Sequence, residues 1–220
     1  MPKPSSHSEP DAAAPATARP VDPVPLIEQA KAGSAAALGR LLDSYAHYLT
    51  LLARMQIGRR VQGKVDPDDV VQETFLEAHR QIARFRGTVE AEFLAWLRVI
   101  LSGQIAMTLR RYLGTKGRDL KLEREIAGDV DRSSSALGQQ LVASVSTPSQ
   151  HASRREQAVI LADALARMPE AYREVIVLRQ IEGLPFADVA ARMGRTEDSV
   201  QKLWVRALAG LRKSMAGGAE

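Results

Sequence analysis

Apolar residues recur with the spacing of an α-helix in two separate blocks of this 220-residue chain. The first block covers residues 26–113 and the second covers 154–215, and neither shows the apolar–polar alternation of a β-strand. A helix face that is apolar at every third or fourth residue is buried against other helices. The sequence therefore predicts an all-α protein with two helical domains.

The segments outside these blocks have compositions that disfavour a packed core. Residues 1–25 hold seven of the eleven prolines among alanines, serines and charged residues, which predicts a disordered tail. Residues 114–153 are interrupted by glycines, three consecutive serines and Pro148, which predicts a flexible linker. Within this linker we expect short helical pieces near residues 120–126 and 137–142.

Composition excludes several classes of protein. The chain has no cysteine, so disulfides, thiol catalysis and cysteine-ligated zinc are excluded, and a cytoplasmic protein is expected. No stretch approaches 18 uninterrupted apolar residues, so we expect no membrane span, and the N-terminus lacks the pattern of a signal peptide. A net charge of +4 is compatible with nucleic-acid binding without demanding it.

An acidic helix start stands out in the first block. Asp66 is suited to cap a helix, Pro67 suits its first position, and Asp68 and Asp69 complement the positive end of the helix dipole. Helical spacing over residues 70–85 then predicts a buried stripe of Val71, Phe75, Ala78, Ile82 and Phe85. The opposite, outward face carries Asp69, Gln72, Glu73 and Leu76.

Two interpretations of this outward face stay open at this point. Five acids and no base lie between Asp66 and Glu77, which is compatible with an ordinary solvated face. The alternative is a docking face for a basic partner surface. An exposed Leu76 within a polar rim favours docking, because such an apolar centre gains from burial.

A basic stretch follows in the same block. Seven bases and two acids lie between Arg98 and Arg124, next to Tyr112. Phosphate backbones attract such stretches, and aromatic side chains stack on exposed bases. A solvated basic helix end remains the alternative.

The second block has the pattern of a helix-turn-helix. A helix over residues 171–181 ends at Glu182-Gly183, a short helix follows Pro185, and Gly194 supplies a turn before Thr196, which is suited to cap the last helix. In that helix the residues predicted to face outward are Ser199, Gln201, Lys202, Val205 and Arg206. In a helix-turn-helix this face enters the major groove of DNA, whereas a hairpin used only for packing is the alternative.

With these residues in view, the chain resembles the extracytoplasmic-function group of bacterial RNA polymerase sigma factors. The resemblance covers about residues 38–215, apart from much of the linker, and it rests on several motifs in order. They are Asp66-Pro67-Asp68-Asp69-Val70-Val71-Gln72-Glu73-Thr74-Phe75, Phe85-Arg86-Gly87, Phe93-Leu94-Ala95-Trp96-Leu97, Ala164-Leu165-Ala166-Arg167-Met168-Pro169, Tyr172-Arg173-Glu174-Val175, Glu182-Gly183-Leu184 and Val189-Ala190.

The resemblance implies a division of labour along the chain, with no catalytic residue, no metal and no cofactor. Residues 26–113 would dock on the clamp helices of the largest polymerase subunit through Asp68, Asp69, Gln72, Glu73 and Leu76. The same domain would recognise and melt the −10 promoter element through Trp96, Arg98, Gln104, Arg110, Arg111 and Tyr112. Residues 154–215 would bind the −35 element through Thr196, Ser199, Gln201, Lys202 and Arg206. The implied partners are core RNA polymerase, promoter DNA and, as for many family members, an anti-sigma factor.

The chain departs from the family pattern in the melting segment, where Ser102-Gly103-Gln104 and Met107 replace an Asn-bearing stretch and an acid. This predicts altered melting. Leu203 and Leu208 occupy recognition-helix positions that are often basic, so fewer phosphate contacts are expected.

Two competing functions remain. One is a helical DNA-binding regulator with a sensory first domain, which would have no need for the acidic face. The other is a metal-dependent enzyme that uses clustered carboxylates at Asp66, Asp68, Asp69 and Glu73. The four histidines are scattered without the spacing of metal ligands.

Overall fold

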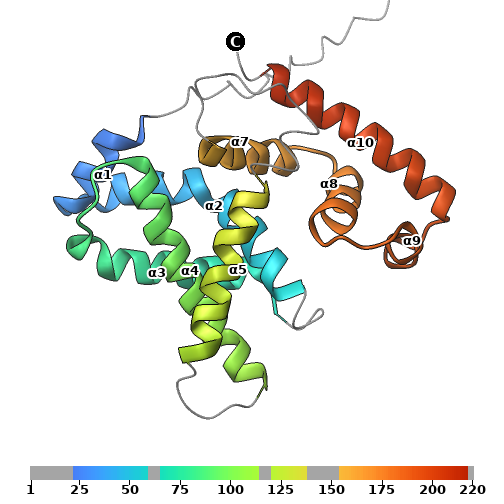
Figure 1. The fold of residues 1–220 in the computed structure, drawn as a ribbon. Coiled ribbons are helices and arrows are strands. Elements are labelled where there is room, and N and C mark those ends of the chain that lie inside the picture. The colour runs from blue at the N-terminus through green and yellow to red at the C-terminus, as the bar shows by residue number, and fades with distance from the viewer. Residues whose placement is uncertain (1–21, 59–64, 114–119, 138–153, 218–220) are drawn as a thin grey trace, which may run out of the picture.

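The computed structural model describes residues 22–58, 65–113, 120–137 and 154–217. Every regular element within these ranges is helical, which confirms the all-α prediction (Figure 1). In chain order the elements are α1 (Pro23–Lys31), α2 (Ala35–Gly58), α3 (Pro67–Gln81), η1 (Ile82–Arg84), α4 (Glu90–Leu113), α5 (Leu120–Ala136), α7 (Arg154–Ala166), α8 (Glu170–Ile176), η3 (Val177–Ile181), α9 (Phe186–Met193) and α10 (Glu197–Gly217).

Two helices of the first domain begin in the same way, with an aspartate cap followed by proline. The Asp66 carboxylate accepts a hydrogen bond from the Asp68 amide at 2.9 Å, and the Asp22 carboxylate accepts one from the Val24 amide. The cap predicted at Asp66 is confirmed. At Asp22 the same chemistry starts α1 three residues before the end of the predicted tail, whose residues 1–21 lie outside the described part of the chain.

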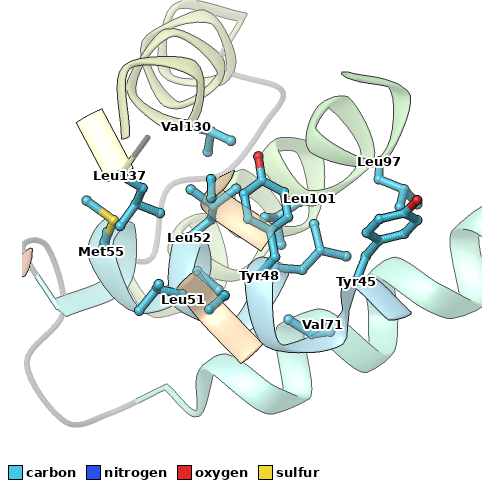
Figure 2. Close-up of a cluster of buried hydrophobic side chains, with 14 of the residues drawn as sticks. Tyr45, Tyr48, Leu51, Leu52, Met55, Val71, Leu97, Leu101, Val130 and Leu137 are labelled. Atoms are coloured by element: carbon cyan, nitrogen blue, oxygen red, sulfur yellow. The ribbon is translucent and has the colours of Figure 1, made fainter. Parts of the chain in front are cut away.

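Helix α2 is the centre of the first domain. It contacts α1, α3, α4 and α5, and its buried residues include Tyr45, Tyr48 and Leu52. Figure 2 shows these side chains meeting others from α3, α4 and α5, such as Val71 and Leu101. Because α2 has neighbours on several sides, most of its residues are buried.

Helix α3 is shorter than the predicted helix over 70–85. It ends at Gln81 and continues as the 3-10 turn η1, yet Ile82 and Phe85 remain buried as the predicted stripe requires. Phe75 of that stripe is half-buried.

One helix occupies much of the segment predicted to be a flexible linker. Helix α5 is 17 residues long and packs on α4 and α2, whereas only short helical pieces were expected. Its serines make buried polar contacts: Gln56 Nε2 donates to Ser133 Oγ at 2.8 Å, and the Tyr48 and Ser134 hydroxyls are 2.8 Å apart. Satisfied hydrogen bonds let a serine-rich helix be buried. Residues 114–119 and 138–153 lie outside the described ranges.

Helix α4 is the core helix against which α1, α3 and α5 pack. Among the described residues, only Glu90–Tyr112 is long and apolar enough to cross a bilayer, and 56% of its most apolar window is buried inside the protein. Such burial is typical of a core helix.

The second domain is a helix-turn-helix formed by α9 and α10, supported by α8 and η3. Gly194 ends α9 in the left-handed conformation, with φ of 61°, and the Arg195 amide donates to the Ala190 carbonyl at 3.0 Å. A residue with a Cβ rarely adopts this conformation, which explains why glycine makes the turn. Helix α7 lies between α2 and α10 (Figure 1), and His47 Nδ1 is 2.9 Å from an Asp163 carboxylate oxygen.

Candidate protein-docking and nucleic-acid interfaces

The outward face of α3 is exposed as its helical spacing predicts. Asp69, Gln72, Glu73 and Leu76 are all exposed, and 53% of Leu76 is accessible to solvent. Asp68 is also exposed, but one of its carboxylate oxygens accepts a hydrogen bond from Thr50 Oγ1 of α2 at 3.0 Å. The face therefore presents carboxylates and an amide around an apolar side chain, on a helix held from both sides.

Further along α3, Glu77 is held by neighbours on the same helix. Gln81 Nε2 and Arg80 Nη1 both donate to its carboxylate, and these hydrogen bonds lower the pKa of Glu77 below its usual value. Glu77 therefore remains ionised at neutral pH, and its charge is partly compensated by Arg80.

The acidic face borders an open groove of about 500 Å³ between the first turns of α3 and the last turns of α4. Its α3 wall includes Asp69, Gln72 and Glu73, and its α4 wall includes Arg111 and Tyr112. Residues predicted separately for docking and for −10 DNA binding thus share one hollow. The sequence predicted each set but not that they are neighbours.

Arg98, predicted to contact DNA, lies inside the protein. Only 7% of its side chain is exposed, and its Nε donates to an Asp131 carboxylate oxygen of α5 at 2.8 Å. Burial by itself lowers the pKa of Arg98, but Tyr48 and Asp131 outweigh it, so the pKa is raised and the guanidinium stays charged. In this conformation Arg98 joins α4 to α5 and is not at the surface.

The remaining residues predicted for −10 recognition differ in exposure. Arg111 and Tyr112 are exposed, whereas Arg110 is 19% exposed and donates to Glu123 of α5 at 2.8 Å. Gln104 is half-buried, and its Oε1 has no hydrogen-bond partner among the described residues.

Trp96 is half-buried at the surface end of an aromatic cluster. Its ring lies 5.0 Å from that of Phe85 and 5.4 Å from that of Phe93, measured between centroids. One edge of this cluster is therefore at the surface beside the loop that joins η1 to α4. The loop holds the motif Phe85-Arg86-Gly87, which the family resemblance places at the start of the promoter-melting segment.

Helix α10 carries the residues predicted to bind the −35 element. Thr196 Oγ1 accepts from the Ser199 amide at 3.3 Å, which confirms the cap, and Ser199 is half-buried. Gln201, Lys202 and Arg206 are exposed, as predicted. Val200, Ala207 and Leu211 on the opposite face are buried.

Two of the exposed α10 side chains have acidic partners on their own helix. Lys202 Nζ lies 2.7 Å from an Asp198 oxygen, and Gln201 Nε2 donates to Glu197 at 3.3 Å. These contacts span one helical turn at the surface, where such pairs contribute little stability and exchange readily for a ligand.

Among the residues that the structure describes, no group of three or more acidic or histidine side chains is arranged to hold a metal ion. The carboxylates of Asp66, Asp68, Asp69 and Glu73 are all exposed.

Two family models match the chain. The model for Sigma-70 region 2 covers residues 39–113, and the model for Sigma-70 region 4 covers residues 158–211. The first range holds most of α2 with α3, η1 and α4, and the second holds most of α7 with the helix-turn-helix and its supporting helices.

Curated relatives match over most of the chain. The ECF RNA polymerase sigma-E factor of Haemophilus influenzae is 32% identical over 168 residues, which is 76% of this chain and 82% of the relative. The ECF RNA polymerase sigma factor BldN of Streptomyces coelicolor is 31% identical over 188 residues, and the match spans 83% of this chain but only 62% of the relative.

Solved structures that resemble the chain include the RsbN–BldN complex, with 26% identity, 85% and 97% coverage of the two chains, and a TM-score of 0.28. CnrH in complex with the cytosolic domain of CnrY has 25% identity, 86% and 95% coverage, and a TM-score of 0.33. From the family models and the 32% identical relative, the chain belongs to the extracytoplasmic-function group of RNA polymerase sigma factors.

Proposed function

We propose that this sigma factor holds core RNA polymerase with the acidic face of α3 and holds promoter DNA with α4 and α10. As a member of its family the protein binds core polymerase and directs promoter-specific initiation of transcription. The polymerase performs the nucleotidyl transfer, and the sigma factor supplies recognition.

The single observation that carries the docking proposal is the exposed face of Asp69, Gln72, Glu73 and Leu76 on a well-capped helix. Its carboxylates suit a basic helical surface, and Leu76 supplies an apolar centre that gains from burial. We propose the clamp helices of the largest polymerase subunit as the partner. Asp68 supports this face through its bond to Thr50 and remains accessible at its edge.

For −10 recognition we propose Trp96, Gln104, Arg110, Arg111 and Tyr112. Exposed Tyr112 and the accessible edge of Trp96 suit stacking on unpaired bases, and Arg111 suits phosphate contact. We do not include Arg98 among the residues that contact the −10 element, because its guanidinium is buried against Asp131. We assign it instead to the packing of α5 on α4.

For −35 recognition we propose the exposed face of α10, with Thr196, Ser199, Gln201, Lys202 and Arg206 at or near the DNA. Gln reads adenine through two hydrogen bonds, while Lys and Arg contact guanine or phosphate in the major groove. We propose that DNA displaces Asp198 from Lys202, since that exposed pair is weakly held.

The test has two stages. The first selects active promoters from a randomised library by in vitro transcription with core polymerase and this sigma factor. The second compares the wild type with Asp69→Arg plus Glu73→Arg, which should abolish binding to core polymerase because both charges on the face reverse. The fold should be unaffected, as both side chains are exposed. Unchanged core binding would contradict the docking proposal and favour a DNA-binding regulator of another type.

The proposed activity takes place where polymerase and chromosome meet, so we propose a cytoplasmic protein. No cofactor or metal is required. Regulation by an anti-sigma factor stays a prediction from the family resemblance.

A further inference from the structure

The loop that joins η1 to α4 presents exposed side chains on a fixed backbone. Arg86, Thr88 and Val89 are exposed, with Val89 at 47%, and they flank Gly87. A Cβ atom placed on Gly87 would lie 2.3 Å from Phe85 Cζ and 2.9 Å from Glu92 Cβ. The backbone therefore passes so close to the aromatic cluster that only glycine fits.

The loop is held by side-chain hydrogen bonds at the end next to α4 and at its centre. A Glu92 oxygen accepts from the Thr88 amide at 2.9 Å and from the Val89 amide at 3.4 Å, at the start of α4. At the centre, Lys31 Nζ of α1 donates to the Gly87 carbonyl at 2.9 Å. The Lys31 ammonium also lies 6.0 Å from the centroid of the Phe85 ring.

The bond from Lys31 ties α1 to this loop across 56 residues of the chain. Among the described residues of α1, Lys31 is the one whose side chain is seen to bond to the loop. Helix α1 also contacts η1 and α4. It lies before residue 39, where the match to the Sigma-70 region 2 model begins.

The loop held by Lys31 lies against an aromatic pair that includes a residue proposed to contact DNA. Phe85, which the Lys31 ammonium faces, packs against Trp96 with the two ring planes tilted by 35°. Trp96 is among the residues that we propose for −10 recognition. A charge-assisted bond at the Gly87 carbonyl thus acts on the loop backbone and on the aromatic ring beneath it.

We propose that Lys31 is a positioning residue for promoter melting. Its ammonium group holds the loop of residues 85–89 and the Phe85–Trp96 pair in the conformation that captures the unpaired −10 strand. This inference rests on the proposed function, because it requires that the surface formed by the loop and Trp96 contacts DNA. Helix α1 is then a working part of the melting domain.

The test uses the full-length chain assembled with core polymerase and a promoter from the selection described above. The variants are Lys31→Met, which removes the ammonium, and Lys31→Arg, which keeps a cationic donor. Arg40→Met is the matched control, since it removes an exposed positive charge from the neighbouring helix α2. The readouts are the affinity for core polymerase and the affinity of the holoenzyme for a single-stranded oligonucleotide of the non-template −10 strand.

We expect Lys31→Met to weaken oligonucleotide binding by about tenfold, the effect of losing one charge-assisted hydrogen bond. Core affinity should stay within about twofold, because the α3 face is untouched. Lys31→Arg should recover most of the oligonucleotide affinity, and Arg40→Met should behave as the wild type. Gly87→Ala, which displaces the same loop from the other side, should reproduce the Lys31→Met defect.

Three results would overturn the proposal. The first is that Lys31→Met binds the oligonucleotide as well as the wild type does, and the second is that Lys31→Arg recovers none of the lost affinity. The third is that Lys31→Met loses oligonucleotide and core binding equally, which would indicate general damage to the fold. Failure of the proposed function itself looks different, because the wild-type protein would then fail to bind core polymerase or to open the selected promoter.

Discussion

The two helices expected to meet DNA, α4 and α10, carry their basic residues in opposite ways. On α10, Lys202 and Arg206 are exposed, and the only contact seen for the Lys202 ammonium is with an acid on the same helix. On α4, Arg98 and Arg110 are engaged by acids of α5. Helix α10 packs through one face, whereas α4 has neighbours on several sides. Packing against α5 therefore buries Arg98 and pairs Arg110, which must exchange Glu123 for DNA, whereas Arg111 is exposed as the bases of α10 are.

The largest effect should come from removing the exposed bases of α10. Lys202→Ala with Arg206→Ala should weaken promoter binding about a hundredfold, since each lost contact is worth about 1–2 kcal/mol. The dependence of log affinity on log salt should flatten by about two. Gel-shift titrations of the holoenzyme at several salt concentrations measure both quantities. Polymerase affinity should be retained, and parallel losses of both affinities would contradict separate binding surfaces.

On α4, replacing a buried basic residue by alanine should reduce the stability of the fold rather than the affinity for DNA. Arg98→Ala should lower the free energy of unfolding by about 2 kcal/mol, because a buried side chain loses its packing and its bond to Asp131. Urea denaturation measures this. Arg98→Met keeps most of the packed stem and should be less destabilised. If Arg98→Ala had normal stability but bound the −10 element more weakly, Arg98 would have to be assigned to the DNA interface.

The smallest expected effect concerns the exposed side of α4. A Cβ on Gly103 would meet no atom within 4 Å, so Gly103→Ala should raise the free energy of unfolding by about 0.5–1 kcal/mol through better helix propensity. Urea denaturation provides the measurement, and the same substitution at Gly87 should instead be destabilising. Destabilisation at Gly103 would mean that α4 is not a regular, open helix there.

Much of the fold could be predicted because the determining contacts are local. The Asp66 and Thr196 caps, the glycine turn at Gly194 and the outward faces of α3 and α10 depend on residues within about one helical turn of each other. The structure confirms both caps, the glycine turn and these exposed residues, except that Ser199 of the predicted α10 face is half-buried. Of the family motifs, the one over residues 66–75 contains the Asp66 cap and part of the α3 face.

The prediction for the α5 segment was wrong, because its serines and glycine are typical of a flexible linker. Serine disfavours helices when its hydroxyl competes for the backbone. Here the Ser133 and Ser134 hydroxyls are satisfied by Gln56 and Tyr48, which lie 77 and 86 residues away in the chain. Helix propensity depends only on neighbouring residues, so it contains no information about hydrogen-bond partners that far away in the chain.

The sequence by itself determined that this chain is helical, where α3 and α10 begin, which residues of their outer faces are exposed apart from Ser199, and which family it resembles. Only the tertiary structure decided that Arg98 is buried, that α5 belongs to the first domain, and that Lys31 reaches the Gly87 carbonyl. The physical reason is that periodicity reports which face of a helix is apolar. Which polar side chains meet across helices depends on how the helices pack, and packing is a property of the whole chain.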